Sequence, residues 1–153
     1  MSCLFCEIIS GEVSATVVFE DDICIAFLDH RPLFPGHSLL VPRNHFETLS
    51  DLPTDLVSPL FANVQLLTRA VETALSAEGS FVAMNNRVSQ SVPHLHVHVV
   101  PRKRKDGLKG FFWPRTKYGN EAELLAVQTA IRSAITEIQK TNSISKRPEG
   151  DPQ

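Results

Sequence analysis

Seven consecutive residues, from His94 to Val100, alternate between imidazole and aliphatic side chains until the final pair of valines. Such alternation is typical of a β-strand, in which neighbouring side chains point to opposite faces of the sheet. The pattern predicts a strand over 94–100 with one apolar, buried face. On the other face, His94, His96 and His98 are expected to form a row at intervals of about 6.6 Å.

Four further strands are predicted from β-rich runs that end at turn signals. Residues 17–28 contain two such runs, which are separated by Glu20-Asp21-Asp22 and are expected to form a hairpin. A third run covers 38–41 and ends at Pro42, and a fourth covers 81–84. Together with 94–100 they predict a sheet of about five strands.

Two long helices and one short helical turn are expected beside these strands. Residues 53–77 carry apolar side chains at spacings of three and four, which is typical of an amphipathic helix. Pro59 would cost about 3 kcal/mol inside a helix, so its regular part is expected to begin near Ser58. A similar stripe predicts a helix over 121–140, and residues 3–10 are expected to form a short turn stopped by Gly11. The apolar positions are Leu60, Val64, Leu67, Val71 and Leu75 in the first helix, and Leu124, Leu125, Val127, Ala130, Ile131, Ile135 and Ile138 in the second.

This order of elements predicts an α+β domain with an antiparallel sheet, because consecutive strands lack the helical crossovers that parallel pairing needs. A chain of 153 residues suits one domain. We expect that domain to cover residues 1–140. Residues 141–153 are polar and rich in proline, and they are expected to be a disordered tail.

The composition argues against nucleic acid and membranes as partners. Fifteen basic residues nearly balance 17 acidic ones, and 42% of the chain is hydrophobic. No apolar run approaches the roughly 20 residues that span a bilayer, and the N-terminus lacks the features of a signal peptide. Cys3, Cys6 and Cys24 form an odd set that favours a reducing compartment and a metal or thiol role. A cytoplasmic location is therefore expected.

The histidine run admits three interpretations. The first is the polar face of an edge strand. The second is a zinc site in which the row supplies the ligands of a zinc-dependent hydrolase. The third interpretation is nucleophilic catalysis, in which a neutral imidazole attacks phosphorus and is later released. His96 suits the nucleophile's role because a histidine on either side can orient it and supply protons.

The residues from Gln90 to Val100, Gln-Ser-Val-Pro followed by the histidine run, resemble the motif of the histidine triad (HIT) family of nucleotide hydrolases and transferases. Other blocks resemble the same family in the same order, so that the resemblance covers roughly Cys3 to Arg102. These blocks are Phe19–Asp22, Ala26–Asp29, Pro35–His37 and Leu40–His45.

The resemblance implies a HIT-like fold and an enzyme that cleaves at the α-phosphate of a dinucleoside polyphosphate or a nucleoside phosphoramidate. A nucleotidyl-histidine intermediate would form on His96, and a nucleoside monophosphate, expected to be AMP, would be released. His98 would contact the phosphate and help the leaving group, while His94 supports the array. The alternative is a nucleotide-binding regulatory protein with little catalysis.

The family's nucleotide-binding positions can be carried over residue by residue. Asp29 resembles the residue that binds the ribose hydroxyls, a task that suits a carboxylate with its two acceptor oxygens. Apolar side chains near the N-terminus and at position 27 would enclose the base, and polar side chains before the triad would bind the phosphate. The full set is Phe5, Ile8, Phe27, Asp29, Asn85, Gln90, Ser91 and His98, with Leu4 beside the base.

The N-terminal cysteines resemble those of a zinc-binding branch of the family. In that branch the pair equivalent to Cys3 and Cys6 is completed by the residues equivalent to His45 and His94. Two thiolates and two imidazoles suit a closed, tetrahedral zinc site with a structural role. The alternative is a pair of free thiols. If zinc takes one nitrogen of His94, that ring fixes geometry and does not shuttle protons.

Two further features bear on partners. The family commonly forms homodimers and places a Trp-Pro pair near the neighbouring subunit's site, which Trp113-Pro114 resembles at a position farther along the chain. A homodimer is therefore expected. Ser89 stands where the family usually has glycine, and the loop after Asn86 is about two residues short. The sequence leaves the physiological leaving group open for this reason.

Overall fold

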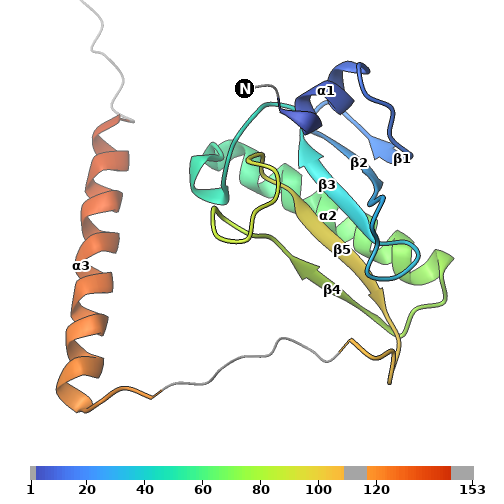
Figure 1. Cartoon of the computed structure of the whole chain (residues 1–153). Helices are drawn as coiled ribbons and strands as arrows, with labels where there is room; N and C mark the ends of the chain where they lie inside the picture. Colours follow the sequence, from blue (N-terminus) through green and yellow to red (C-terminus); the bar gives the residue numbers. More distant parts are fainter. Residues whose placement is uncertain (1–2, 109–116, 146–153) are drawn as a thin grey trace, which may run out of the picture. The chain divides into compact units, whose positions relative to one another are not determined.

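The protein is described by a computed structural model that covers residues 3–108 and 117–145. Side chains of residues 134–145 are outside that description. The chain divides into two compact units, Met1–Leu108 and Lys109–Gln153, and each is considered by itself. The first unit carries the sheet and two α-helices, and the second carries one helix (Figure 1). The expectation of one domain over 1–140 remains a prediction.

The first unit contains a five-stranded antiparallel sheet with the strand order β1-β2-β3-β5-β4. The hairpin predicted within residues 17–28 is present, with a turn around Asp21 and Asp22 between its strands. The α+β class and the five antiparallel strands are confirmed. The strands are β1 (Val17–Glu20), β2 (Cys24–Leu28), β3 (Ser38–Pro42), β4 (Gly79–Ala83) and β5 (Val97–Arg102).

Strand β5 begins at Val97, three residues later than predicted, and ends at Arg102. Its pairing with β3 covers only Val97 to Val99, opposite Leu40 to Ser38, although β3 itself continues to Pro42. The N–H of Leu95 bonds to the carbonyl of Phe46 in a connecting segment. The prediction of one strand over 94–100 was therefore wrong at its start, and His94 and His96 precede the strand.

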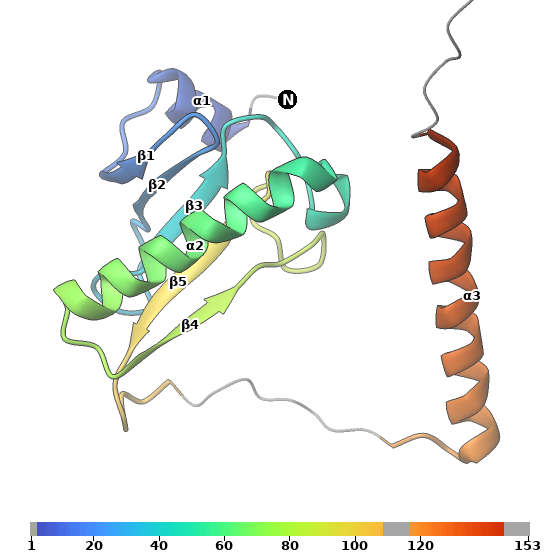
Figure 2. The ribbon, with the colours of Figure 1, turned by 180° about the vertical axis from the view of Figure 1, so that it is seen from behind.

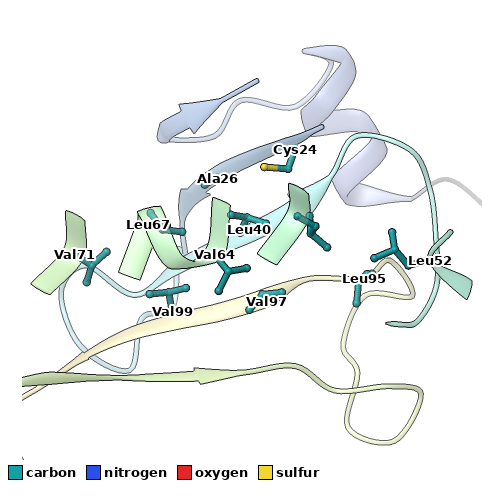
Figure 3. Packing of buried hydrophobic residues seen from close by; sticks show 11 residues of the cluster. Cys24, Ala26, Leu40, Leu52, Val64, Leu67, Val71, Leu95, Val97 and Val99 are labelled. Carbon is teal, nitrogen blue, oxygen red and sulfur yellow. The ribbon is translucent and has the colours of Figure 1, made fainter. Parts of the chain in front are cut away.

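Helix α2 (Thr54–Ala74) covers one face of the sheet and encloses the larger core (Figures 2 and 3). Leu60, Val64, Leu67 and Val71 are buried as predicted, whereas Leu75 lies past the helix end and is 40% exposed. The helix begins at Thr54, so the expectation of a start near Ser58 was wrong. Pro59 is accommodated inside the helix, where burial of the apolar stripe offsets the lost hydrogen bond.

The larger core contains the side chains that β2, β3 and β5 direct towards α2, together with the buried residues of the helix. A short 3-10 helix, Leu49–Asp51, leads into α2. The buried members of this core are Cys24, Ala26, Leu40, Leu52, Leu60, Val64, Leu67, Val71, Leu95, Val97 and Val99.

A smaller core lies on the opposite face of β2 and β3, under helix α1 (Leu4–Ser10). The helix ends at Gly11, whose φ of 83° is the left-handed conformation that glycine adopts readily, as the predicted stop signal required. Successive residues of β2 and β3 point alternately to the two cores. The smaller core consists of Phe5, Ile25, Phe27, Leu39 and Val41.

The second unit contains helix α3 (Glu121–Ser145), which extends five residues beyond the predicted end at 140. Leu124, Leu125, Val127 and Ile131 are exposed on it, and the side chains of Ile135 and Ile138 are outside the description. Trp113-Pro114 also falls outside the described residues. Among the helices in the described ranges, none has the length and apolar character to cross a membrane.

Candidate active site

A cavity of about 630 Å³ opens between α1, the end of β2 and the segment that carries the histidines. Its apolar wall comes mainly from α1 and Phe27, and its polar wall includes Asp29, Ser91 and three histidines, His30, His96 and His98. Eight of the residues predicted for catalysis and nucleotide binding therefore line one cavity. They are Leu4, Phe5, Ile8, Phe27, Asp29, Ser91, His96 and His98.

His96 is 2% exposed, and a backbone carbonyl fixes its tautomer. Nδ1 of His96 lies 2.7 Å from the carbonyl oxygen of His94. Because a carbonyl oxygen only accepts hydrogen bonds, Nδ1 carries the proton and Nε2 keeps its lone pair. Nε2 has no hydrogen-bond partner among the described residues, so its lone pair is available to a ligand in the cavity.

His98 is oriented by His37, a residue to which the sequence analysis gave no chemical role. The Leu33 N–H donates to Nδ1 of His37 at 3.1 Å, so the proton of His37 is on Nε2. That nitrogen lies 3.0 Å from Nδ1 of His98 and donates to it. The proton of neutral His98 is then on Nε2, which makes this nitrogen a hydrogen-bond donor.

His37 and His98 are both neutral near pH 7. Burial lowers the pKa of His37, against the opposing attraction of Asp29. Burial lowers the pKa of His98 to about 4, with further contributions from the neighbouring charges of His96 and His37. The donor chain from Leu33 to His98 therefore does not depend on protonated imidazole. The weak sequence signal for His37 was its place in the Pro35-Gly36-His37 block.

Gly36 explains how His37 reaches this position. Its φ is 95°, and a side chain at this residue would collide with Leu75. The positive φ favours glycine, and any other residue here would also have to displace the end of the Leu75 side chain. Asp29 lies across this turn, with its backbone N–H bonded to the carbonyl of His37 and its carboxylate 3.7 Å from Nδ1 of that ring.

Asn85 and Gln90 hold the loop before the triad and are not among the residues lining the cavity. The Asn85 amide donates to the carbonyl of Ser89, and the Gln90 amide donates to the carbonyl of Glu47 at 2.6 Å. The Gln90 side-chain oxygen accepts the N–H of Arg87. Arg87 and Ser89 both have positive φ, at 68° and 60°, which is strained for residues other than glycine. A direct contact of either amide with nucleotide remains a prediction.

Four potential metal ligands meet beside this site: Cys3, Cys6, His45 and His94. One ligand atom from each lies within 4.8 Å of all the others. Nδ1 of His94 is 3.4 Å from Cys3 Sγ and 3.6 Å from Cys6 Sγ, and Cys6 Sγ is 3.4 Å from Nδ1 of His45. Zinc bond lengths of about 2.3 Å to sulfur and 2.0–2.1 Å to nitrogen give S···N separations of about 3.5 Å in a tetrahedron.

The tautomer of His94 also suits a metal. Its Nε2 lies 2.9 Å from the carbonyl oxygen of Pro42 and must donate to it. Nδ1, which faces the two thiols, therefore keeps the lone pair that a metal requires. The residues present fit zinc. His94 is fully buried and is not among the residues lining the cavity, so it faces the metal cluster while His96 faces the cavity.

The chain is similar to several known proteins. Residues 10–105 match the HIT domain family model. An adenylylsulfatase of Arabidopsis thaliana is 37% identical over 108 residues, which are 69% of this chain and 55% of that longer protein. An adenosine 5'-monophosphoramidase of Schizosaccharomyces pombe is 31% identical over 137 residues, covering 88% of this chain and 99% of its own length.

Among solved structures, a zinc-bound histidine triad family protein from Mycobacterium smegmatis is 36% identical with a TM-score of 0.67. The match covers 88% of this chain and 98% of that one.

Proposed function

Because the chain belongs to the HIT family, we propose that it is a nucleotide hydrolase or transferase that acts at the α-phosphate of an adenosine nucleotide. Two relatives bear the names of nucleotide hydrolases, an adenylylsulfatase and an adenosine 5'-monophosphoramidase. Both names describe the release of AMP from a group on its phosphorus. The observation that carries the proposal is Nε2 of His96, an unprotonated nitrogen on a ring that lines a nucleotide-sized cavity.

In the first step, the lone pair of Nε2 attacks the α-phosphorus. A nitrogen–phosphorus bond forms, the bond to the leaving group breaks, and the leaving group departs with the bonding electrons. The His96 ring becomes a cation because Nδ1 keeps its proton. The carbonyl of His94 accepts a charge-assisted hydrogen bond from that proton and stabilises the intermediate.

In the second step, water attacks phosphorus and the nitrogen–phosphorus bond breaks, so that Nε2 recovers its lone pair. One proton of the water stays on the new phosphate oxygen of AMP or is lost to solvent. The other proton replaces the one that the leaving group took up in the first step. The overall reaction consumes one water and releases AMP and the protonated leaving group. A different acceptor in place of water would make the enzyme a transferase.

His98 is proposed to donate from Nε2 to a phosphate oxygen or to the leaving group. His37 is a positioning residue, because it acts through Nδ1 of His98 and has no direct contact with the phosphate in this scheme. Asp29 is proposed to accept the ribose hydroxyls, and the apolar wall with Phe5, Ile8 and Phe27 to hold the base. Ser91 is proposed to bind the phosphate directly. The amides of Asn85 and Gln90 are proposed to assist phosphate binding by holding the shape of the loop.

Zinc is proposed as a structural ion held by Cys3, Cys6, His45 and His94. When bound it would supply a rigid cross-link between the N-terminal segment and the residue that precedes the nucleophile by two positions. A homodimer is proposed from the family resemblance, and a cytoplasmic location from the apolar content and the odd cysteine set. Sedimentation of the full chain with and without nucleotide would test the dimer.

The proposed function is tested by turnover on three substrates: adenosine 5'-phosphoramidate, adenylyl sulfate and a dinucleoside polyphosphate. We expect AMP release from at least one of them, measured by chromatography, and its loss in His96→Ala. Tight binding of AMP without turnover on any substrate would support the regulatory alternative. The zinc-dependent alternative is tested with His94→Ala. If this variant still binds zinc through the other triad residues, and if its activity requires that zinc, the protein is a zinc-dependent hydrolase.

A further inference from the structure

Helix α1 takes part in two sites at once. Cys6 lies on it and Cys3 lies one residue before it, so it supplies both thiols of the metal cluster. The same helix supplies Phe5 and Ile8 to the wall of the nucleotide cavity. Any shift of α1 therefore changes both sites together.

Little else holds this helix in place. It has seven residues, which is too few for a helix that is stable by itself, and its N-cap Cys3 makes no side-chain capping bond. Phe5 is its one buried residue. The docking of α1 thus depends on Phe5, on partly buried neighbours such as Ile8 and Ile9, and on whatever the cysteines bind.

The ring of Phe5 connects the metal cluster to the nucleophile. Its centroid lies 6.0 Å from that of His94, the metal-facing histidine, and 5.2 Å from that of His96. The Phe5 and His96 rings meet edge to face, with 80° between their planes. It also packs edge to face against Phe27, at 5.6 Å. One aromatic ring thus contacts a metal ligand, the nucleophile and the base-binding wall.

We propose that zinc binding and nucleotide binding are coupled through helix α1, with Phe5 as the positioning residue that connects the two sites. Zinc holds α1 against the sheet and so completes the cavity wall that packs on the base. A bound base holds the same helix from the cavity side and so keeps both thiols in place for zinc. Since coupling between two binding equilibria is reciprocal, each ligand must raise the affinity for the other by the same factor.

The proposal rests on the proposed nucleotide site, and its test does not depend on turnover. The affinity of the full-length chain for zinc is measured by competition with a chromophoric chelator, with and without saturating AMP. AMP is a product and is not consumed. We expect AMP to tighten zinc binding by at least about fivefold, the lower end of typical allosteric coupling. Calorimetric titration of AMP into the zinc-loaded and zinc-free chain should give the same factor.

Two variants of α1 assign the coupling to Phe5. Phe5→Leu keeps an apolar side chain but removes the ring contacts with His94 and His96, so the coupling factor should fall towards one. Ile9→Ala is the matched control, because Ile9 packs in the same small core but does not line the cavity. It should retain the wild-type factor. Far-UV circular dichroism checks that each zinc-free variant remains folded.

The outcomes separate this proposal from the proposed function. A chain that binds both ligands with a coupling factor of one overturns the coupling and leaves the proposed function intact. A chain that binds no AMP overturns both. Failure to bind zinc overturns the coupling, and so does a Phe5→Leu variant that retains the full factor.

Discussion

The two cores of the first unit differ in size and in what surrounds them. The core under α2 has eleven buried residues, and its one ionisable member is Cys24, whose pKa burial raises to about 11. The core under α1 has five buried residues, and its Phe5 ring contacts both His94, which faces the Cys/His cluster, and His96, which lines the cavity. The same strands build both, because alternate residues of β2 and β3 point to opposite faces.

This difference indicates a division of roles between the faces of the sheet. The α2 face buries apolar area on a 21-residue helix and supplies most of the stability. The α1 face is shallow and opens into the cavity, so its residues are available to ligands. Substitutions on the two faces should therefore change different measurements, and the following predictions run from the largest expected effect to the smallest.

His96→Ala should have the largest effect, and this effect should be confined to kcat. Loss of an attacking nucleophile costs at least about 10³-fold in kcat. Affinity for AMP, measured by calorimetry, should change little, because the cavity wall stays in place. A variant that retained even a tenth of the wild-type kcat would break the assignment of the α1 face to catalysis by His96.

Leu60→Ala and Ile8→Ala compare the two faces directly. Leu60 is fully buried under α2, and its truncation should lower the free energy of unfolding by about 2–5 kcal/mol. KM of the folded protein should not change. Ile8→Ala should cost less stability but raise KM, since Ile8 lines the cavity. Urea unfolding and steady-state kinetics give both quantities, and a reversed pattern would refute the division.

His37→Leu should lower kcat by on the order of 10²-fold with a smaller change in KM, because His98 loses the donor that fixes its tautomer. His37→Asn offers an N–H donor in the same place and should restore part of the activity. Equal loss in both variants would reduce His37 to a packing role. Unfolding curves are needed alongside, because the Leu variant leaves the Leu33 N–H without its acceptor.

Acid should destabilise the protein through the α1 face. The pKa of His98 is about 4 in the folded protein and near 6.5 when unfolded, so the unfolded chain binds more protons between these values. The stability contribution is complete above pH 6.5 and falls as the pH drops towards 4. The titratable groups that face His98 are His96, His37 and Asp29. In His98→Asn the loss of unfolding free energy between pH 7.5 and 5 should be smaller than in the wild type.

The sequence predicted the apolar side of the fold well, because burial leaves a periodic signature. The spacing of Leu60, Val64, Leu67 and Val71 identified the α2 face, and the alternation of Val97, His98 and Val99 gave the orientation of β5. The start of α2 was wrong, since the cost of Pro59 is local whereas the burial that offsets it is tertiary.

The site was predictable only in part. His96 and His98 lie in one short run, so their pattern was visible. The start of β5 depends on a tertiary contact, because the N–H of Leu95 bonds to the carbonyl of Phe46 and not to β3. The contact between His37 and His98 joins residues 61 positions apart, and that between Cys3 and His94 spans 91. Spacing alone cannot predict such pairs. The metal cluster followed from the family resemblance, and the role of His37 required the structure.

The central claim is that His96 forms a covalent bond to phosphorus. Its most direct test is rapid denaturing quench of the enzyme during turnover of adenosine 5'-phosphoramidate, followed by intact mass spectrometry at neutral to alkaline pH. A wild-type chain heavier by one AMP minus one water is predicted, with the adduct on His96 and absent in His96→Ala. Steady turnover with no adduct on the wild-type chain, or the same adduct in His96→Ala, would contradict the account.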